Sequence, residues 1–231
     1  MKKLFYYAMM AMMMMGSAVV ISACESSSDS DDPDSGEVDT RLDNVVPKDI
    51  RDKMGRYITF YNGVNPPNVE GVYLMSPDIL VYSSDNTFSI GDVFNDLYFR
   101  LSNQNSKNNT IDYQENQGKQ TQVGSGAFIS GEGNNFTIFF NNTGKIYDIK
   151  VKTAMVISGT KTSSGIANLR YALALIDKDP DPDNIAMEIG EFRIFEDKDG
   201  LTEFSEWPTG TRAGGFSIEL PSFVSGSNLE Y

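Results

Sequence analysis

The group of side chains whose spacing most resembles a cation site is an acidic segment beginning at residue 177. Glu188 stands at the twelfth position of such a loop, after four aspartates at alternating positions, Asp177, Asp179, Asp181 and Asp183. Oxygen ligands at this spacing bind Ca²⁺ in EF-hands. The sixth position must be glycine for the sharp turn, whereas this chain has Pro182, whose φ is fixed at about −65°. The segment is therefore no EF-hand loop, and two interpretations stay open: a calcium site of another geometry, or a proline-stiffened hairpin tip in solvent.

A second acidic segment follows the first. Asp197, Asp199 and Glu206 stand at loop positions three, five and twelve, and Gly200 stands at position six. Position one would be Phe195, whose side chain has no oxygen. We therefore predict either an Asp-Gly turn in this segment or a single Ca²⁺ ion shared between Asp197, Asp199 and the first acidic segment.

Three aromatic side chains are candidates for ligand contact. Tyr57 and Tyr61 stand close together, and Trp207 is the only tryptophan in the chain. Together such rings could form a platform for a sugar or a lipid. The alternative is that Trp207, which precedes Pro208, closes one end of a barrel.

The composition excludes much of enzymatic chemistry. The chain has no histidine and one cysteine, which excludes a Ser-His-Asp triad, a Cys-His pair, a histidine zinc site and histidine acid–base catalysis. Paired carboxylates could hydrolyse glycosides, but the glutamates of 188–206 have no spacing that marks a catalytic pair. We predict that the protein is not an enzyme and has no cofactor apart from the calcium considered above.

The N-terminal residues have the pattern of a secretory signal. Lys2 and Lys3 precede an uncharged, largely apolar stretch that extends to residue 23. The stretch ends Ile21-Ser22-Ala23-Cys24, which resembles the lipobox of bacterial lipoproteins. That resemblance implies cleavage after residue 23 and lipidation of the Cys24 thiol, so that acyl chains hold the protein on a membrane. The alternative is an uncleaved signal-anchor helix, since about 20 apolar residues span a bilayer.

We expect residues 24–44 to comprise the lipidated cysteine and a disordered acidic tether. From Glu25 to Asp39 the chain has seven acidic residues and no basic one, and so polar a segment buries too little apolar surface to fold. A serine- and aspartate-rich run directly after the cysteine resembles the export tether of Bacteroidota surface lipoproteins. That resemblance implies an outer-membrane lipoprotein displayed at the cell surface, rather than one facing the periplasm.

Residues 45–231 are predicted to form a single domain. From residue 41 onward the chain has 17 basic and 25 acidic residues, a net charge of −8. Nucleic acids are bound by clusters of Lys and Arg, so this charge excludes them as partners. This part of the chain has no cysteine, so packing and not disulfides must stabilise it.

Hydrophobic periodicity predicts one helix followed by strands. Pro47 suits the first turn of a helix whose apolar face is Ile50, Met54, Tyr57 and Ile58. Alternating apolar residues predict strands with these inward faces: Leu97, Phe99 and Leu101; Phe136, Ile138 and Phe140; Tyr147, Ile149, Val151, Met155 and Ile157; and Leu169, Tyr171, Leu173 and Leu175. The alanines of 168–176 make a helix the rival interpretation there. Further strands are predicted at 72–75, 79–82, 111–115, 122–129, 187–194 with a bulge at Gly190, and 216–220.

About ten strands joined by short, turn-rich connections form an antiparallel meander. Such a meander most simply closes into a barrel, because closure removes the exposed sheet edges; a two-sheet β-sandwich is the alternative. The predicted helix, followed by Gly71-Val72-Tyr73, resembles the lipocalin entrance, in which a helix precedes a Gly-x-Trp strand. The predicted fold is therefore mainly β, a lipocalin-like barrel with one N-terminal helix.

These features together predict a non-enzymatic surface lipoprotein whose barrel binds a small apolar or glycan ligand in its mouth. The alternative is an adhesion module, in which exposed loops contact a partner protein and Ca²⁺ orders the acidic tips. In both cases the protein contacts the membrane through its lipid anchor.

Overall fold

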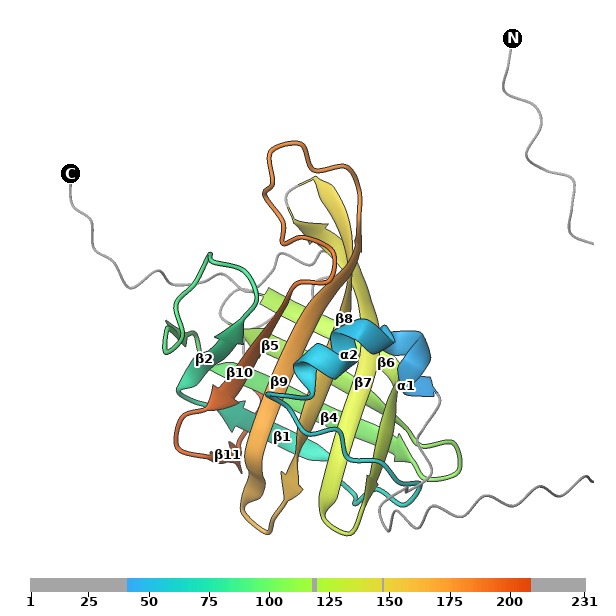
Figure 1. Cartoon of the computed structure of the whole chain (residues 1–231). Coiled ribbons are helices and arrows are strands. Elements are labelled where there is room, and N and C mark those ends of the chain that lie inside the picture. Colours follow the sequence, from blue (N-terminus) through green and yellow to red (C-terminus); the bar gives the residue numbers. More distant parts are fainter. Residues whose placement is uncertain (1–40, 118–119, 147, 209–231) are drawn as a thin grey trace, which may run out of the picture. The chain divides into compact units, whose positions relative to one another are not determined.

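A computed structural model describes residues 41–117, 120–146 and 148–208. The predicted signal, Cys24, most of the tether and the strand predicted at 216–220 lie outside these residues. The described chain begins with two short helices, α1 (Arg41–Val45) and α2 (Lys48–Met54). Eleven strands follow (Figure 1): β1 (Gly71–Met75), β2 (Asp78–Ser83), β3 (Val93–Phe94), β4 (Leu97–Asn105), β5 (Thr110–Gln117), β6 (Gln120–Glu132), β7 (Asn135–Ile146), β8 (Ile149–Lys161), β9 (Gly165–Lys178), β10 (Phe192–Asp197) and β11 (Leu201–Phe204).

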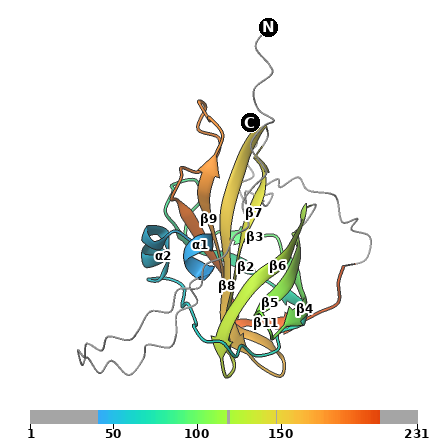
Figure 2. The same ribbon diagram turned by 90° about the vertical axis from the view of Figure 1, so that its right-hand side faces the viewer.

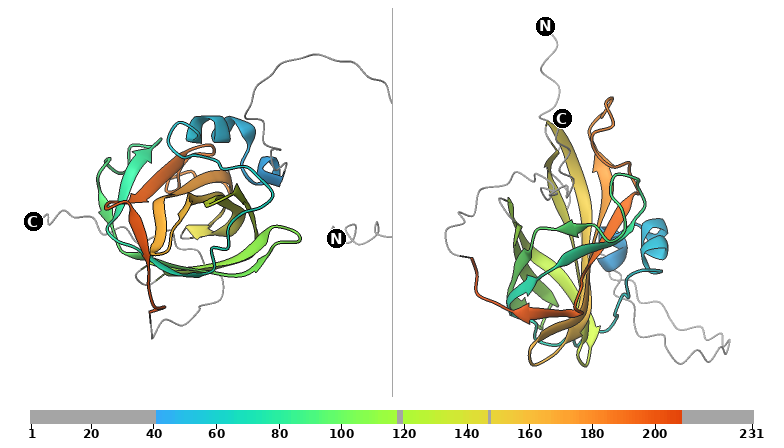
Figure 3. Two further views of the ribbon diagram at one scale, coloured as in Figure 1. Left: turned by 90° about the horizontal axis from the view of Figure 1, so that it is seen from below. Right: turned by 90° about the vertical axis from the view of Figure 1, so that its left-hand side faces the viewer.

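The strands form one antiparallel sheet that closes on itself. The strand β1 pairs with β4 on one side and with β11 on the other, and β11 also pairs with β9. Short interruptions divide three of the barrel strands, so that β1 continues into β2, β3 into β4, and β10 into β11. The result is a closed barrel of eight strands in which each pairs with its neighbours along the chain (Figure 3). The predicted meander and barrel are confirmed, and eight is also the strand number of lipocalins.

The barrel interior is built from the alternating residues that the sequence marks as inward-facing. The three apolar faces predicted on β4, β7 and β9, together with Val151, Met155 and Ile157 of β8, are all buried in one continuous core. The rival helix at 168–176 is wrong, because those residues belong to the long strand β9. The predicted strand at 187–194 is also wrong in part: β10 begins only at Phe192, and Gly190 lies in the connection before it with a φ of +92°.

Both helices pack on the outer face of the barrel (Figure 2). Ile50 and Met54 of α2 are buried against small outward-facing residues, among them Ala154 of β8 and Ala172 of β9. Alanines let the helix approach the sheet closely, which explains the alanine content that resembles a helix in sequence. None of the helices in the described ranges is long and apolar enough to cross a membrane.

The first helix corrects the predicted boundary between tether and domain. Residues 41–44 were expected to belong to the disordered tether, but they form most of α1, and Leu42 and Val45 are buried in the same outer cluster as α2. The described part of the chain therefore has two short helices where one was predicted. The two buried apolar residues, Leu42 and Val45, are separated by two polar residues. A helix with only two apolar residues is too short to show a hydrophobic period in the sequence.

The chain between α2 and β1 seals one end of the barrel, which we call the closed end. Backbone hydrogen bonds join Gly63 and Asn65 to Gly131 of β6. Gly63, whose φ is +129°, permits this approach, because a Cβ atom at Gly63 would lie 2.6 Å from the Gly131 carbonyl oxygen. Val69 then enters the core with no exposed surface, and Tyr73 donates its hydroxyl hydrogen to the Val69 carbonyl oxygen at 2.8 Å. At the opposite end of the barrel, which we call the loop end, lie the last residues of β2, β5, β7 and β9.

Candidate functional site

A groove of about 570 Å³ lies on the outer face of the barrel, beside α2. Its walls come from three parts of the chain: the end of α2 and the turn after it, the end of β2, and the start of β10 with the connection that precedes it. This volume falls within the range of about 300–1,000 Å³ that is usual for small-ligand pockets. The lining residues are Asp49, Lys53, Arg56, Tyr57, Tyr82, Ser84, Ile189, Gly190, Glu191 and Phe192.

Two tyrosines form an aromatic wall in the groove. The rings of Tyr57 and Tyr82 stack with centroids 3.8 Å apart, and Tyr82 lies 5.0 Å from the ring of Phe192. Both tyrosines are half-buried, so part of each ring stays accessible. Tyr57 is thus one of the ligand residues predicted from sequence, and Tyr82 is a partner that only the fold reveals.

The position of Tyr57 is fixed by the chain around it. Its N–H donates to the Met54 carbonyl at 2.8 Å and continues the turn of α2. Its carbonyl accepts a hydrogen bond from the guanidinium of Arg170 in β9, which also forms an ion pair with Glu196 at 3.0 Å. The opposite side of the groove is held by Phe192, whose N–H donates to the Ser84 hydroxyl at 2.8 Å. The aromatic wall is therefore positioned in advance of any ligand.

Charges of both signs surround this wall. Lys53 and Arg56 are exposed, and neither forms an ion pair with another residue of the described ranges. Asp49 and Glu191 supply carboxylates on the same lining. The groove therefore combines hydrogen-bond donors and acceptors with aromatic rings.

Tyr61 and Trp207 do not join Tyr57. Tyr61 lies against β7 and β6, where its N–H donates to the Thr137 hydroxyl and its carbonyl accepts from Ser130. The ring of Trp207 lies 4.6 Å from the guanidinium carbon of Arg100 in β4, a strand on another part of the barrel wall. The predicted three-residue platform is therefore not formed, and only Tyr57 lines the groove.

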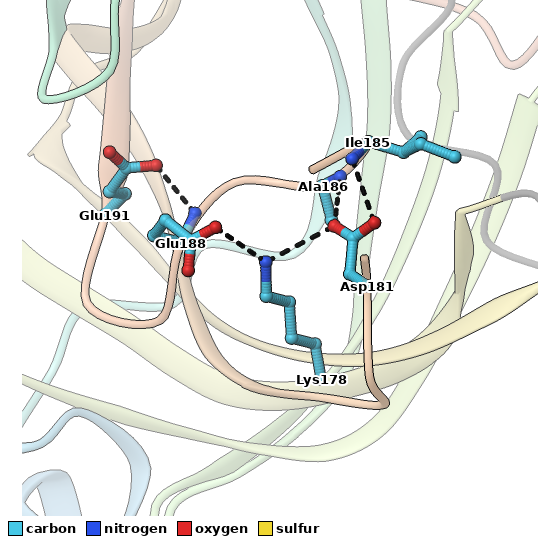
Figure 4. Close-up of polar contacts among 6 residues, drawn as sticks. All are labelled: Lys178, Asp181, Ile185, Ala186, Glu188 and Glu191. Carbon is cyan, nitrogen blue, oxygen red and sulfur yellow. Dashed lines mark hydrogen bonds and ion pairs between the residues drawn. The ribbon is translucent and has the colours of Figure 1, made fainter. Parts of the chain in front are cut away.

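The first acidic segment begins at the end of β9 and continues into the β9–β10 connection. Its central aspartate, Asp181, is held by contacts with neighbouring residues (Figure 4). The Asp181 carboxylate accepts hydrogen bonds from the N–H groups of Ile185 and Ala186 at 3.0 and 2.9 Å. Lys178 lies 3.3 Å from the same carboxylate and 3.0 Å from that of Glu188. The hydrogen bond from the Ile185 N–H is the main reason why the pKa of Asp181 lies below its usual value. The oxygens needed for calcium are thus used to shape the loop.

The six predicted calcium ligands are not brought together around a common point. Within the described ranges, no three carboxylates lie where they could hold one metal ion. Asp177 pairs with Lys152 in the strand register, while Asp179 and Asp183 are exposed on the connection. Asp199 makes the predicted Asp-Gly turn, accepting a hydrogen bond from the Leu201 N–H at 2.9 Å. The shared calcium site therefore remains a prediction without support from this geometry.

Asp197, the remaining member of the six predicted calcium ligands, is one of three carboxyl groups of the described chain that are buried inside the barrel. Asp78, Glu115 and Asp197 are each at most 3% exposed. Gln117 donates to Asp78 Oδ2 at 2.9 Å, and the hydroxyl of Tyr113 donates to Glu115. The sequence carries a signal for Glu115, because it shares the inward parity of the apolar residues of β5, but it does not indicate that Asp78 and Asp197 are paired.

Burial raises the pKa of all three carboxyl groups. The pKa of Asp78 rises to about 8, because burial and the nearby carboxylates of Asp197 and Glu115 outweigh the hydrogen bond from Gln117. Burial likewise raises the pKa of Glu115 to about 7 and that of Asp197 to about 6. Buried acids with displaced pKa values are typical of functional sites, and also of structural clusters.

Comparison of the chain with protein-family models, with curated proteins and with solved structures finds no match.

Proposed function

We propose that this protein is a lipid-anchored, non-enzymatic binding protein of the outer-membrane surface, and that the groove beside α2 takes a glycan ligand. The anchor part of the proposal rests on the sequence around Cys24. The ligand part rests on the groove, and it moves the site from the barrel mouth, where the sequence suggested it, to the outer wall.

The observation that carries the proposal is the stacked pair of Tyr57 and Tyr82 within a groove of about 570 Å³. Sugars have apolar C–H faces, which pack against aromatic rings, and hydroxyl groups, which both donate and accept hydrogen bonds. Lys53 and Arg56 can donate to such hydroxyls, and the carboxylates of Asp49 and Glu191 can accept from them. A purely apolar ligand could not form hydrogen bonds with these charged groups.

The test is a glycan-array screen of the purified full chain in detergent, followed by titration of the best oligosaccharide. We expect saturable binding by the wild type and a loss of at least about tenfold in affinity, about 1.4 kcal/mol, in Tyr57→Ala. Tyr61→Ala is the matched control, because this tyrosine lies outside the groove and its described hydrogen bonds come from backbone atoms. Binding to no oligosaccharide, or equal losses in both variants, would overturn the proposal.

A second function, adhesion to a protein, is favoured by exposed apolar side chains near the loop end. Ile90 and Val93 follow β2, and Ile185 and Ile189 precede β10; all four are about half exposed or more. Such residues mark interaction surfaces when they lie together. The attachment of cells to coated surfaces distinguishes the two functions. The double variant Ile90→Asp with Ile185→Asp should weaken attachment to protein-coated surfaces. Tyr57→Ala should instead weaken attachment to glycan-coated surfaces.

A further inference from the structure

Two carboxyl groups face each other inside the barrel, near its loop end. Asp78 begins β2 and Asp197 ends β10, and the strand register places them directly opposite each other. Side chains opposite each other on paired strands have Cβ atoms about 4.5–5.5 Å apart, and two like charges at that distance destabilise the pair. Gln117, which donates a hydrogen bond to Asp78, is the last residue of β5 and lies at the loop end of that strand.

Each of these aspartates has one buried oxygen without a partner. Asp78 Oδ1 and Asp197 Oδ1 accept no hydrogen bond from any described residue, although the other oxygen of each side chain is bonded. A buried, unpaired acceptor costs about 1–3 kcal/mol, and more when it is charged. These two oxygens therefore lack hydrogen-bond donors, and a bound molecule could supply them.

Within the described ranges, no basic side chain pairs with these acids. Arg193 is buried on the same strand as Asp197, but its guanidinium lies 2.7 Å from the carboxylate of Asp85 and 4.8 Å from the ring centre of Phe88. When these acids are ionised, the charge of the pair, and that of Glu115, which is close enough to affect Asp78, has no counter-ion in the described protein.

The surroundings of the pair are apolar and aromatic. Leu80 and Phe195, each two residues from one of the aspartates, belong to the barrel core. Phe195 contacts Phe94 and Tyr171, with ring centres 5.1 and 5.9 Å away. An alkyl or aryl group attached to a cation would therefore meet matching side chains.

We propose that the loop end of the barrel interior is a cation site, in which Asp78 and Asp197 bind the ammonium group of a small organic amine. An ammonium group has three N–H donors and one positive charge. It therefore supplies hydrogen-bond donors to the unpartnered oxygens and a counter-ion to the carboxylate pair. A metal ion fits less well, because no three carboxylates of the described chain are placed to hold one. This site is separate from the groove beside α2, which lies on the outer face of the barrel.

The test is calorimetric titration of the full chain in detergent with methylamine and benzylamine, and with benzyl alcohol as the neutral analogue. About pH 8.5 lies above the raised pKa values of these carboxyl groups, so the acids are largely ionised there. At this pH we expect saturable binding of at least one amine. Benzyl alcohol should bind at least about tenfold more weakly, and binding should weaken at about pH 5.5, where the acids hold protons. This pH comparison needs no variant.

Asp78→Asn and Asp197→Asn should each weaken amine binding at least about tenfold, with folding checked by circular dichroism. Glu132→Gln, an exposed acid at the closed end, is the control and should bind as the wild type does. The proposal is overturned if neither amine binds, if benzyl alcohol binds equally well, or if both Asn variants keep wild-type affinity. It is also overturned if the wild type binds Ca²⁺ but no amine, and if the Asn variants lose this Ca²⁺ binding.

Discussion

Asp78 is a carboxyl group in surroundings that stabilise its neutral form. Burial is the main cause of its raised pKa, and the groups that face it are Gln117, which donates a hydrogen bond, and the acids Asp197, Glu115 and Asp96. The folded chain keeps this proton up to about pH 8, whereas an unfolded aspartate loses it at about pH 3.9. The folded state thus binds more protons between these values, and the free energy of unfolding must fall as pH rises through this window.

Asp78→Asn replaces the titrating carboxyl group by an amide that does not titrate. The amide keeps an oxygen that can accept a hydrogen bond from Gln117. We expect the wild type to lose stability between about pH 5 and about pH 8, at up to about 1.4 kcal/mol per pH unit from this residue. The variant should lose less, and the difference between the two should grow with pH. Urea denaturation at both pH values measures it; parallel pH profiles for the two proteins would show that Asp78 is charged in the folded state.

At the scale of elements, the β9–β10 connection is ordered by one aspartate. Asp181→Ala removes the acceptor of two backbone N–H groups and of Lys178. We expect several-fold faster limited proteolysis within residues 179–191, because local opening becomes easier while the barrel stays folded. Asp183→Ala, an exposed position on the same connection, should leave the cleavage rate unchanged. Equal cleavage of both variants would mean that Asp181 does not order the connection.

The elements that sequence predicts well are those with strict alternation. The strands β4, β7, β8 and β9 each have a run of inward apolar residues, and closure of the meander follows from them. The interruptions after Met75, Phe94 and Asp197 are not predictable in this way, because each depends on the register of a neighbouring strand. The same reason hides the pairing of Asp78 with Asp197, whose residues are distant in sequence.

The groove was only partly predictable for a related reason. Tyr57 could be identified as one of the aromatic residues that could form a platform for a sugar or a lipid. Tyr82 looked like an ordinary strand residue, and its outward position depends on a register shift between Ile194 and Phe195 of the partner strand. The six predicted calcium ligands are not brought together in this structure, and spacing along the chain does not show which oxygens bond to nearby backbone N–H groups, as those of Asp181 do.

For the whole molecule, the proposed location depends on Cys24. Cys24→Ser removes the thiol that would carry the acyl chains, so we expect the protein to leave the membrane fraction, since no helix within the described ranges could hold it in a bilayer. Metabolic labelling with radioactive palmitate should mark the wild type and leave the variant unmarked. Full retention of the variant in membranes would instead favour an uncleaved signal-anchor helix.

The central claim, that a glycan binds beside α2, is tested most directly by hydrogen–deuterium exchange of the full chain with and without a saturating oligosaccharide from the array. The account predicts slower exchange in peptides that cover residues 53–57 and 189–192, which line the groove, with little change in β4 and β5. Slower exchange at the closed end or in β4 and β5, with residues 53–57 and 189–192 unchanged under saturating binding, would contradict it.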